Sequence, residues 1–305
     1  MKTEQHWQDV FKAVLKDTDV VLEILDARNP LGTHNHAIEK FMQQNKPQMK
    51  LILVLNKKDL VPKEIFNAWV NYFKQQNYEI FSTCAKFHSG TMFLFHRLRD
   101  LGKSGNENIL IVGYPNTGKS SLIQALTKNK KKVGISSSAG FTRAIKRIKL
   151  TNNLYLIDTP GVIPIDETDE TAIALKACMV ADKVKDPLAV VEALYDLLPV
   201  KMFEKLYKIG IYAKNSNLEE SDSLDELIER IGKKHGPLRA GGKINENEVY
   251  KRIIRDWQLN KLHYFNYPPG YNEEYDEAQI KVVKKVQKSQ IGIPTSLKRT
   301  KKEKS

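Results

Sequence analysis

The chain of 305 residues is 41% hydrophobic and 28% charged, which excludes wholesale disorder and allows about two domains at roughly 100–200 residues each. No run approaches the ~20 consecutive apolar residues of a membrane-spanning helix, and Met1 leads into no signal-type apolar segment. Two cysteines, Cys84 and Cys178, cannot supply a disulfide framework or a four-cysteine zinc site. We therefore expect a soluble protein of a reducing compartment, with no membrane among its partners.

The net charge of +13 is concentrated at the carboxyl end of the chain. Residues 281–305 hold nine lysines and arginines and one acid, Glu303, so a net +8 lies in this segment. A basic tail is typical of proteins that bind polyanions, of which nucleic acid is the commonest. The alternative is a solvated tail that keeps the protein in solution.

Short, nearly continuous apolar runs predict strands of a parallel sheet that is covered on both faces. These runs lie at residues 20–25, 51–55, 109–112 and 154–157. Helix-like stretches lie between or beside them, at residues 35–44, 64–75, 91–101 and 119–127. The alternation favours a doubly wound α/β domain over residues 1–165. Residues 145–150 alternate apolar with basic side chains and predict a half-exposed strand.

The pattern changes after this first domain. Apolar residues at mixed three- and four-residue steps predict a small all-helical domain over residues 166–270. Residues 271–305 are polar and then basic, and we expect this tail to be disordered.

Gly113-Tyr-Pro-Asn-Thr-Gly-Lys-Ser120 matches the phosphate-loop pattern G-x-x-x-x-G-K-[ST] between a predicted strand and a predicted helix. The glycines let the backbone wrap a phosphate, and the N–H groups at a helix N-terminus form an anion nest. Lys119 would reach the β- and γ-phosphates, and the Ser120 hydroxyl would ligate Mg²⁺. The remaining nucleotide-binding candidates of this loop are Asn116, Thr117, Gly118 and Ser121.

Asn56-Lys57-Lys58-Asp59 follows the strand at 51–55 and matches N-K-x-D. Guanine presents N1–H and N2–H₂ donors on one edge, which the Asp59 carboxylate can accept, whereas adenine would leave that carboxylate unpaired. The stem of Lys57 would lie against the base, and Asn56 would bridge the base and the phosphate loop. Taken alone, the tetrapeptide also fits an ordinary polar turn after a strand.

Three further segments supply candidates. Asp158-Thr-Pro-Gly161 ends the strand at 154–157 and matches D-x-x-G, so Asp158 would hold Mg²⁺ through a water and the Gly161 N–H would sense the γ-phosphate. Thr142 lies between the phosphate loop and Asp158, where a switch threonine would complete the Mg²⁺ shell. Cys84-Ala85-Lys86 would place the Ala85 N–H on guanine O6.

In this chain the base-recognition motifs precede the phosphate loop, and this order resembles the circularly permuted GTPases of the YlqF/YawG family. Asp26-Ala-Arg-Asn-Pro30 looks like that family's D-A-R-x-P signature. Residues 236–242 and 255–269 resemble the helical C-terminal region of the archaeal and nucleostemin-like members. The resemblance covers roughly residues 10–269. It implies a P-loop GTPase sheet with permuted motif order, then a small helical domain and the basic tail.

By this resemblance the chain hydrolyses GTP to GDP and phosphate with Mg²⁺, and is a nucleotide-switched assembly factor that contacts rRNA of the large ribosomal subunit precursor. Its catalytic candidates are Lys119, Thr142 and Gly161. Val162 stands where many GTPases place a glutamine that orients the attacking water, so we expect slow hydrolysis that a ribosomal particle stimulates. In several related GTPases an asparagine at the position of Asn116 helps to bind K⁺, which implies stimulation by K⁺.

The resemblance also implies a cytoplasmic protein, nucleolar if the source is eukaryotic, and we expect a monomer away from the ribosome. Cys84 stands where the family usually has serine; we expect little effect, because the base contact is through the backbone. We expect four histidines on loops and helix surfaces, namely His34, His36, His88 and His96.

Two other function classes stay open. One is a GTP-dependent RNA-binding module with negligible hydrolysis, which Val162 favours. The other is an ATP-using P-loop enzyme, which the N-K-x-D motif at 56–59 disfavours.

Overall fold

The computed structural model describes most of the chain between residues 11 and 271. The described ranges are 11–102, 107–127, 135–137 (backbone only), 146–158, 169–209, 223–236 and 242–271. No helix within these ranges is both long enough and apolar enough to cross a bilayer.

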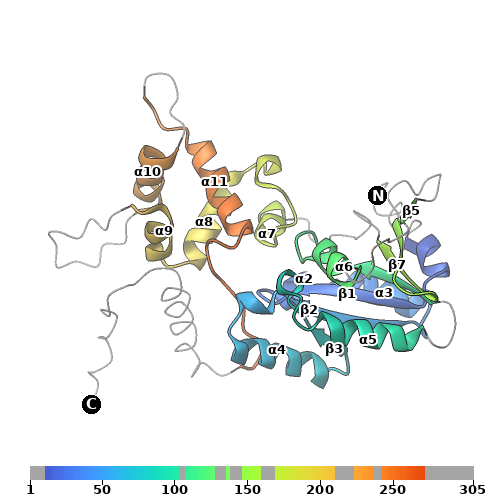
Figure 1. Ribbon diagram of the computed structural model, residues 1–305. Coiled ribbons are helices and arrows are strands. Elements are labelled where there is room, and N and C mark those ends of the chain that lie inside the picture. Colours follow the sequence, from blue (N-terminus) through green and yellow to red (C-terminus); the bar gives the residue numbers. More distant parts are fainter. Residues whose placement is uncertain are drawn as a thin grey trace, which may run out of the picture.

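A seven-stranded sheet forms the first domain, in the order β3-β2-β1-β4-β7-β6-β5 (Figure 1). The first five strands of this order are mutually parallel, whereas β6 and β5 each run antiparallel to their neighbour. The strands are β1 (Val20–Asp26), β2 (Lys50–Asn56), β3 (Glu79–Ser82), β4 (Glu107–Val112), β5 (Ile135–Ser137), β6 (Lys146–Lys149) and β7 (Leu154–Asp158). The four apolar runs are β1, β2, β4 and β7, so the predicted doubly wound α/β domain is confirmed.

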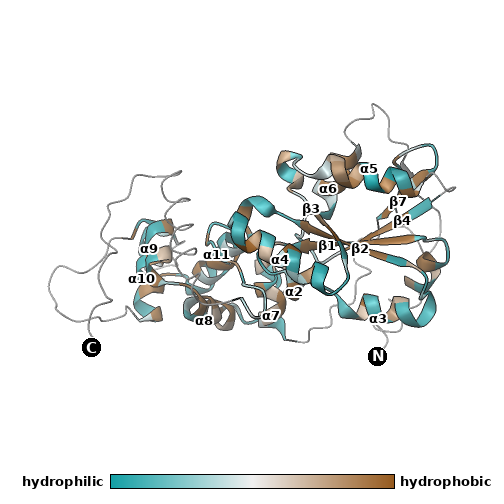
Figure 2. Cartoon of the chain, turned by 90° about the horizontal axis from the view of Figure 1, so that it is seen from below, coloured by the Kyte–Doolittle hydropathy of each residue, from teal (hydrophilic) through white to brown (hydrophobic). Residues whose placement is uncertain are grey.

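Helices cover both faces of the sheet, as the apolar runs require. Leu94 and Leu98 of α5 and Leu122 of α6 pack on one face, and Ile38 of α3 and Trp69 of α4 pack on the other. Figure 2 shows the apolar strands between these helices. The helical segments of this domain are α2 (Pro30–Thr33), α3 (His36–Asn45), η1 (Lys58–Leu60), α4 (Lys63–Gln75), η2 (Ala85–Phe87), α5 (Thr91–Leu101) and α6 (Lys119–Thr127).

Strand β6 is the half-exposed strand that the alternation at 145–150 predicts. Ile148 is buried, whereas Lys146, Arg147 and Lys149 are exposed. The three cations therefore lie on the surface near one edge of the sheet.

The second domain consists of helices around a core of its own. Val190, Leu194, Phe203, Ile231 and Ile253 are fully buried in this core. Its segments are α7 (Glu170–Leu175), η3 (Ala181–Lys183), α8 (Pro187–Leu197), α9 (Val200–Tyr207), α10 (Leu224–His235) and α11 (Glu246–Gln258). The predicted boundary near residue 166 and nearly all of the tail lie outside the described residues.

After α11 the chain returns to the first domain, along the orange segment that runs toward α4 in Figure 1. Phe265 is buried against Leu25, Leu55 and Trp69, and the Trp69 Nε1–H donates to the Asn266 carbonyl at 2.8 Å. We predicted that residues up to 270 belong to the helical domain, whereas the end of this range packs on the GTPase-like sheet. This segment packs there through aromatic side chains, because Phe265 and Tyr267 join the hydrophobic cluster that contains Trp69 of α4.

One expectation about the histidines is wrong. His34 is only 5% exposed. Its Nδ1–H donates at 2.9 Å to the carboxylate of Glu23, which lies inside β1 with its side chain fully buried. A carboxylate in the middle of a buried strand requires such a partner. His36, His88 and His96 are exposed, as expected.

Candidate functional site: a guanine-nucleotide cavity

The phosphate loop joins β4 to α6, and its backbone is fixed at both glycines. Gly113 has φ +146°, and a Cβ there would lie 2.6 Å from the Ile24 carbonyl oxygen. The buried Thr117 hydroxyl donates to the Tyr114 carbonyl at 2.9 Å and closes the turn. Lys119 opens α6, with its Nζ donating to the carbonyls of Gly113 and Tyr114 at 2.5 and 2.9 Å.

Two opposite charges lie at the phosphate end of the site. Burial lowers the pKa of Lys119, and the carboxylate of Asp158 opposes this shift. Burial raises the pKa of Asp158, and the positive charges of Lys119 and Lys146 oppose this shift. Asp158 ends β7 beside β4, and Ser120 lies in the first turn of α6. A hydroxyl and a carboxylate are hard oxygen donors of the kind that Mg²⁺ prefers, so these residues fit the predicted metal.

Asn56 links the two halves of the site. Its Nδ2–H donates to the Thr117 carbonyl in the phosphate loop at 2.9 Å, while its Oδ1 accepts from the Thr83 hydroxyl and the Ala85 N–H, both at 3.0 Å. Asn56 therefore ties the phosphate loop to the loop that follows β3. The Ala85 N–H, predicted to donate to guanine O6, donates to this side chain here.

The side chain of Cys84 has a role that the sequence did not suggest. Its Sγ–H donates to Asp59 Oδ1 at 2.9 Å. Burial and this hydrogen bond raise the pKa of the thiol, so it stays protonated and able to donate. The expectation that this side chain has little effect is therefore incomplete, because it positions the carboxylate assigned to guanine. The serine usual in the family would carry an O–H donor at the same point.

Asp26 is a functional candidate that our assignment of site residues missed. It accepts hydrogen bonds from Arg28 Nε at 3.0 Å, Arg28 Nη2 at 2.7 Å and Lys57 Nζ at 2.8 Å. Burial alone would raise the pKa of Asp26, but Arg28 and Lys57 outweigh it and lower this pKa to about 2. Asp26 holds the ammonium of Lys57, a residue that lines a cavity of about 710 Å³. The signal was the D-A-R-x-P motif, which places a carboxylate and a guanidinium at the end of β1.

We expect Asp26→Asn to lower the free energy of unfolding by about 2–3 kcal/mol at pH 7, since a pKa depressed by roughly two units corresponds to that energy. The folded-state pKa lies below the unfolded value of 3.8, so the stabilisation is present above pH 4 and is lost as the pH falls toward 2. Urea unfolding of the native protein and of Asp26→Asn, from pH 7 to pH 3, measures this difference in the free energy of unfolding. A difference that stays the same as the pH falls would contradict the prediction.

Nine of the nucleotide-binding candidates line one cavity of about 710 Å³, and residues of both domains form its wall. Four further candidates that the structure describes, Thr117, Lys119, Ser120 and Asp158, are not among the residues that line it. Asn116 Nδ2–H donates to the Ala177 carbonyl of the helical domain at 2.7 Å. Arg28 Nη1–H donates to Asn260 Oδ1 at 3.0 Å. The lining residues from the first domain include Asn56, Lys57, Asp59, Cys84, Ala85, Lys86, Asn116, Gly118 and Ser121, and those from the second are Gln258, Leu259, Asn260 and His263.

Two predicted site residues, Thr142 and Gly161, lie outside the described residues. The structure therefore brings together the base-recognition loops and the phosphate loop. The two switch positions stay predictions from the sequence.

Comparison with known proteins agrees with this arrangement. The family described as 50S ribosome-binding GTPase matches residues 108–224. The nucleolar GTP-binding protein 2 of Pneumocystis carinii is 32% identical over 283 residues, which are 90% of this chain and 56% of that protein. An uncharacterized GTP-binding protein of Methanocaldococcus jannaschii is 34% identical over 260 residues, which are 84% of this chain and 66% of that protein.

Solved structures of YlqF from T. maritima share the fold. The GNP-bound form has a TM-score of 0.59 at 22% identity and covers 85% of this chain and 96% of its own. The GDP-bound form has a TM-score of 0.60 at 22% identity and covers 86% and 100%. Along the chain, the N-K-x-D loop after β2 precedes the phosphate loop after β4. The chain belongs to the YlqF-type circularly permuted GTPases.

The permutation explains how this circularly permuted GTPase forms one site from motifs in an unusual order. Strand neighbours in the sheet do not depend on chain order, and the loops after β1, β2, β3 and β4 all leave the carboxyl ends of parallel strands. The segment after β7 then leads into α7 and the helical domain. The chain spans 56% of the length of the Pneumocystis protein and 66% of the length of the archaeal one.

Proposed function

We propose that this circularly permuted GTPase hydrolyses GTP to GDP and phosphate with Mg²⁺, and acts as a nucleotide-switched assembly factor on the large ribosomal subunit. The observation that carries the proposal is the single cavity in which Asp59, the Ala85 loop and the phosphate loop meet. The ribosomal part is supported by the 50S ribosome-binding family match and by the nucleolar relatives.

Each predicted residue has a defined task in this proposal. Asp59 accepts the guanine N1–H and N2–H₂ groups, and Lys119 turns from its loop carbonyls to the β- and γ-phosphates. Ser120 and Asp158, with Thr142, hold the Mg²⁺ ion, which offsets the charge on the phosphates. Water attacks the γ-phosphorus, the bond to the β,γ-bridging oxygen breaks, and its electron pair leaves with GDP.

Contact with rRNA is supported by basic residues on the first domain and in the tail. Lys146, Arg147 and Lys149 are exposed on β6, the neighbour of the strand that ends at Asp158. Residues 281–305 add a net +8. RNA affinity should therefore fall steeply with salt, because each neutralised phosphate releases counterions. In a eukaryotic source this function would place the protein in the nucleolus, and otherwise in the cytoplasm.

We expect GTP turnover in K⁺ buffer to rise when purified large ribosomal subunits are added. Val162 cannot orient water as glutamine does, so intrinsic hydrolysis should be slow and the particle should raise it by at least about 10-fold. Release of phosphate under multiple turnover measures the stimulation by large subunits, with small subunits as the control. The same assay in matched Na⁺ buffer measures the stimulation by K⁺.

The same measurement separates hydrolysis from the alternative function. Tight GTP binding with no stimulation by either particle would favour an RNA-binding module with negligible hydrolysis. Equal rates in Na⁺ and K⁺ would refute the assignment of a K⁺ site at Asn116 and leave the GTPase proposal intact.

A further inference from the structure

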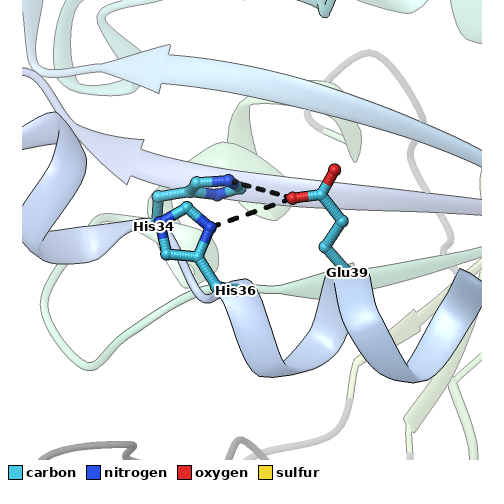
Figure 3. Close-up of side chains that lie close together, drawn as sticks. All are labelled: His34, His36 and Glu39. Carbon is cyan, nitrogen blue, oxygen red and sulfur yellow. Dashed lines mark ion pairs between the residues drawn. The ribbon is translucent and has the colours of Figure 1, made fainter.

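Three potential metal ligands lie together at the start of α3, on residues that do not line the nucleotide cavity. They are His34, His36 and Glu39, and one ligand atom from each lies within 4.8 Å of the others. Figure 3 shows the Glu39 carboxylate facing both imidazole rings. We refer to these three residues as the α3 cluster.

The orientation of His34 is fixed by a buried carboxylate. Its Nδ1–H donates to Glu23 Oε2 at 2.9 Å, and the two side chains are 1% and 0% exposed. The other oxygen of Glu23 accepts the Asn35 N–H at 2.7 Å, so Glu23 is itself held in place. With Nδ1 engaged, Nε2 is the atom that faces Glu39. A carboxylate that holds the far nitrogen of a histidine is the usual outer shell of metal-binding histidines.

Glu39 is held by Tyr78, whose hydroxyl also lies 3.5 Å from His34 Nε2. The Tyr78 hydroxyl lies 3.0 and 2.9 Å from its two carboxylate oxygens. Glu39 Oε2 lies 3.5 Å from His34 Nε2 and 3.9 Å from His36 Nδ1. Ligand bonds of about 2.0–2.1 Å in a tetrahedral zinc site put neighbouring ligand atoms about 3.3 Å apart, so small side-chain movements bring these atoms to binding distance.

Charge and ligand type both favour a divalent transition metal. With neutral imidazoles, Glu23 and Glu39 place two negative charges around the cluster, which one dication would balance. Imidazole nitrogen suits Zn²⁺ rather than Mg²⁺ or Ca²⁺. The His36 side chain is 70% exposed, which gives an ion access from solvent.

We propose that His34, His36 and Glu39 bind one Zn²⁺ ion, with water in the fourth position. The ion joins the first turns of α3 to the buried Glu23 of β1 through His34. It is separate from the Mg²⁺ of the proposed GTPase reaction and does not depend on that reaction.

A proton is the competitor of the metal. Burial would lower the pKa of His34, but its hydrogen bond and charge interaction with Glu23, and then the charge of Glu39, outweigh this and raise it. A protonated His34 bridging two carboxylates would hold the cluster without an ion.

Titration of the full chain with ZnCl₂ in excess Mg²⁺, followed by calorimetry, tests the proposal. We expect one Zn²⁺ per chain, and a loss of affinity of at least about 100-fold in His36→Ala, since this exposed ligand can be removed without disturbing the core. Tyr78→Phe should weaken binding by about 10- to 100-fold, as outer-shell changes do. His96→Ala, at an exposed position on α5, is the matched control and should bind as the native protein does.

Co²⁺ in place of Zn²⁺ identifies the ligands. The visible bands of a four-coordinate ion, without a thiolate charge-transfer band, would exclude Cys84 and Cys178 as ligands. Loss of these bands in His36→Ala would place the ion on the α3 cluster. Absence of binding, or binding that His36→Ala leaves unchanged, would overturn the proposal.

Discussion

Asp59→Asn is expected to weaken GTP binding by at least about 100-fold and to shift the preference of the protein to XTP. Asp59 lies in η1 on the cavity wall, and the Cys84 thiol donates to its Oδ1. A carboxylate accepts from both donors on the guanine edge, whereas an amide matches one of them and opposes the other. Leaving a donor unpaired in the site costs about 1–3 kcal/mol, more when the lost partner is charged. Xanthine carries a carbonyl where guanine carries its amino group, and the amide of the substituted side chain would donate to it.

Competition of unlabelled GTP, XTP and ATP against a fluorescent guanine nucleotide measures the shift. Asp196→Asn, at an exposed position on α8, is the matched control for the change in charge and should bind GTP normally. A variant that keeps its preference for GTP would remove Asp59 from base recognition. Equal competition by ATP and GTP in the native protein would favour the ATP-using enzyme instead.

The fold of the first domain could be predicted closely from the sequence, because its apolar runs and motifs are short segments of neighbouring residues. A buried parallel strand is read as an apolar run, and β1, β2, β4 and β7 each contain one. The motifs follow directly after such runs, so their convergence at one edge of the sheet follows from the parallel arrangement. The less regular 79–82 segment is a strand as well, and it pairs with β2 at the end of the sheet.

The contacts that complete the site were not predictable in this way. Asn260 meets Arg28 across 232 positions of sequence, and Asn116 meets Ala177 across 61. Such contacts depend on how two domains pack, which no local pattern encodes. The motifs alone therefore predicted the first-domain wall of the cavity and missed the wall that the helical domain supplies.

The buried His34 was missed for a different reason. Its sequence neighbourhood, after Pro30 and before α3, reads as a polar loop. The informative residue was Glu23, a single carboxylate inside an otherwise apolar strand, which had to find a buried partner. Its partner is eleven residues away, on the loop that folds back over β1.

Gly118→Ala is expected to abolish measurable GTP binding under conditions where the native protein is saturated. Gly118 has φ +102°, and an added Cβ would lie 2.3 Å from Asn56 Nδ2. Asn56 would have to move away and release the Thr117 carbonyl, which separates the phosphate loop from the Ala85 loop. Backbone strain and one lost buried hydrogen bond should together lower the free energy of unfolding by about 2–4 kcal/mol. Nucleotide binding and urea unfolding measure the two effects.

Two comparisons separate the effect of the contact between the added Cβ and Asn56 from the effect of backbone strain at residue 118. Gly270→Ala has a similar positive φ, +74°, with no atom within 4 Å of an added Cβ, so it should lower stability slightly and leave GTP binding unchanged. In an Asn56→Ala background, Gly118→Ala meets no amide, so its cost should be much smaller than in the native protein, and the two changes should not be additive. Additive costs would mean that the φ of Gly118, rather than its contact with Asn56, requires glycine in the phosphate loop.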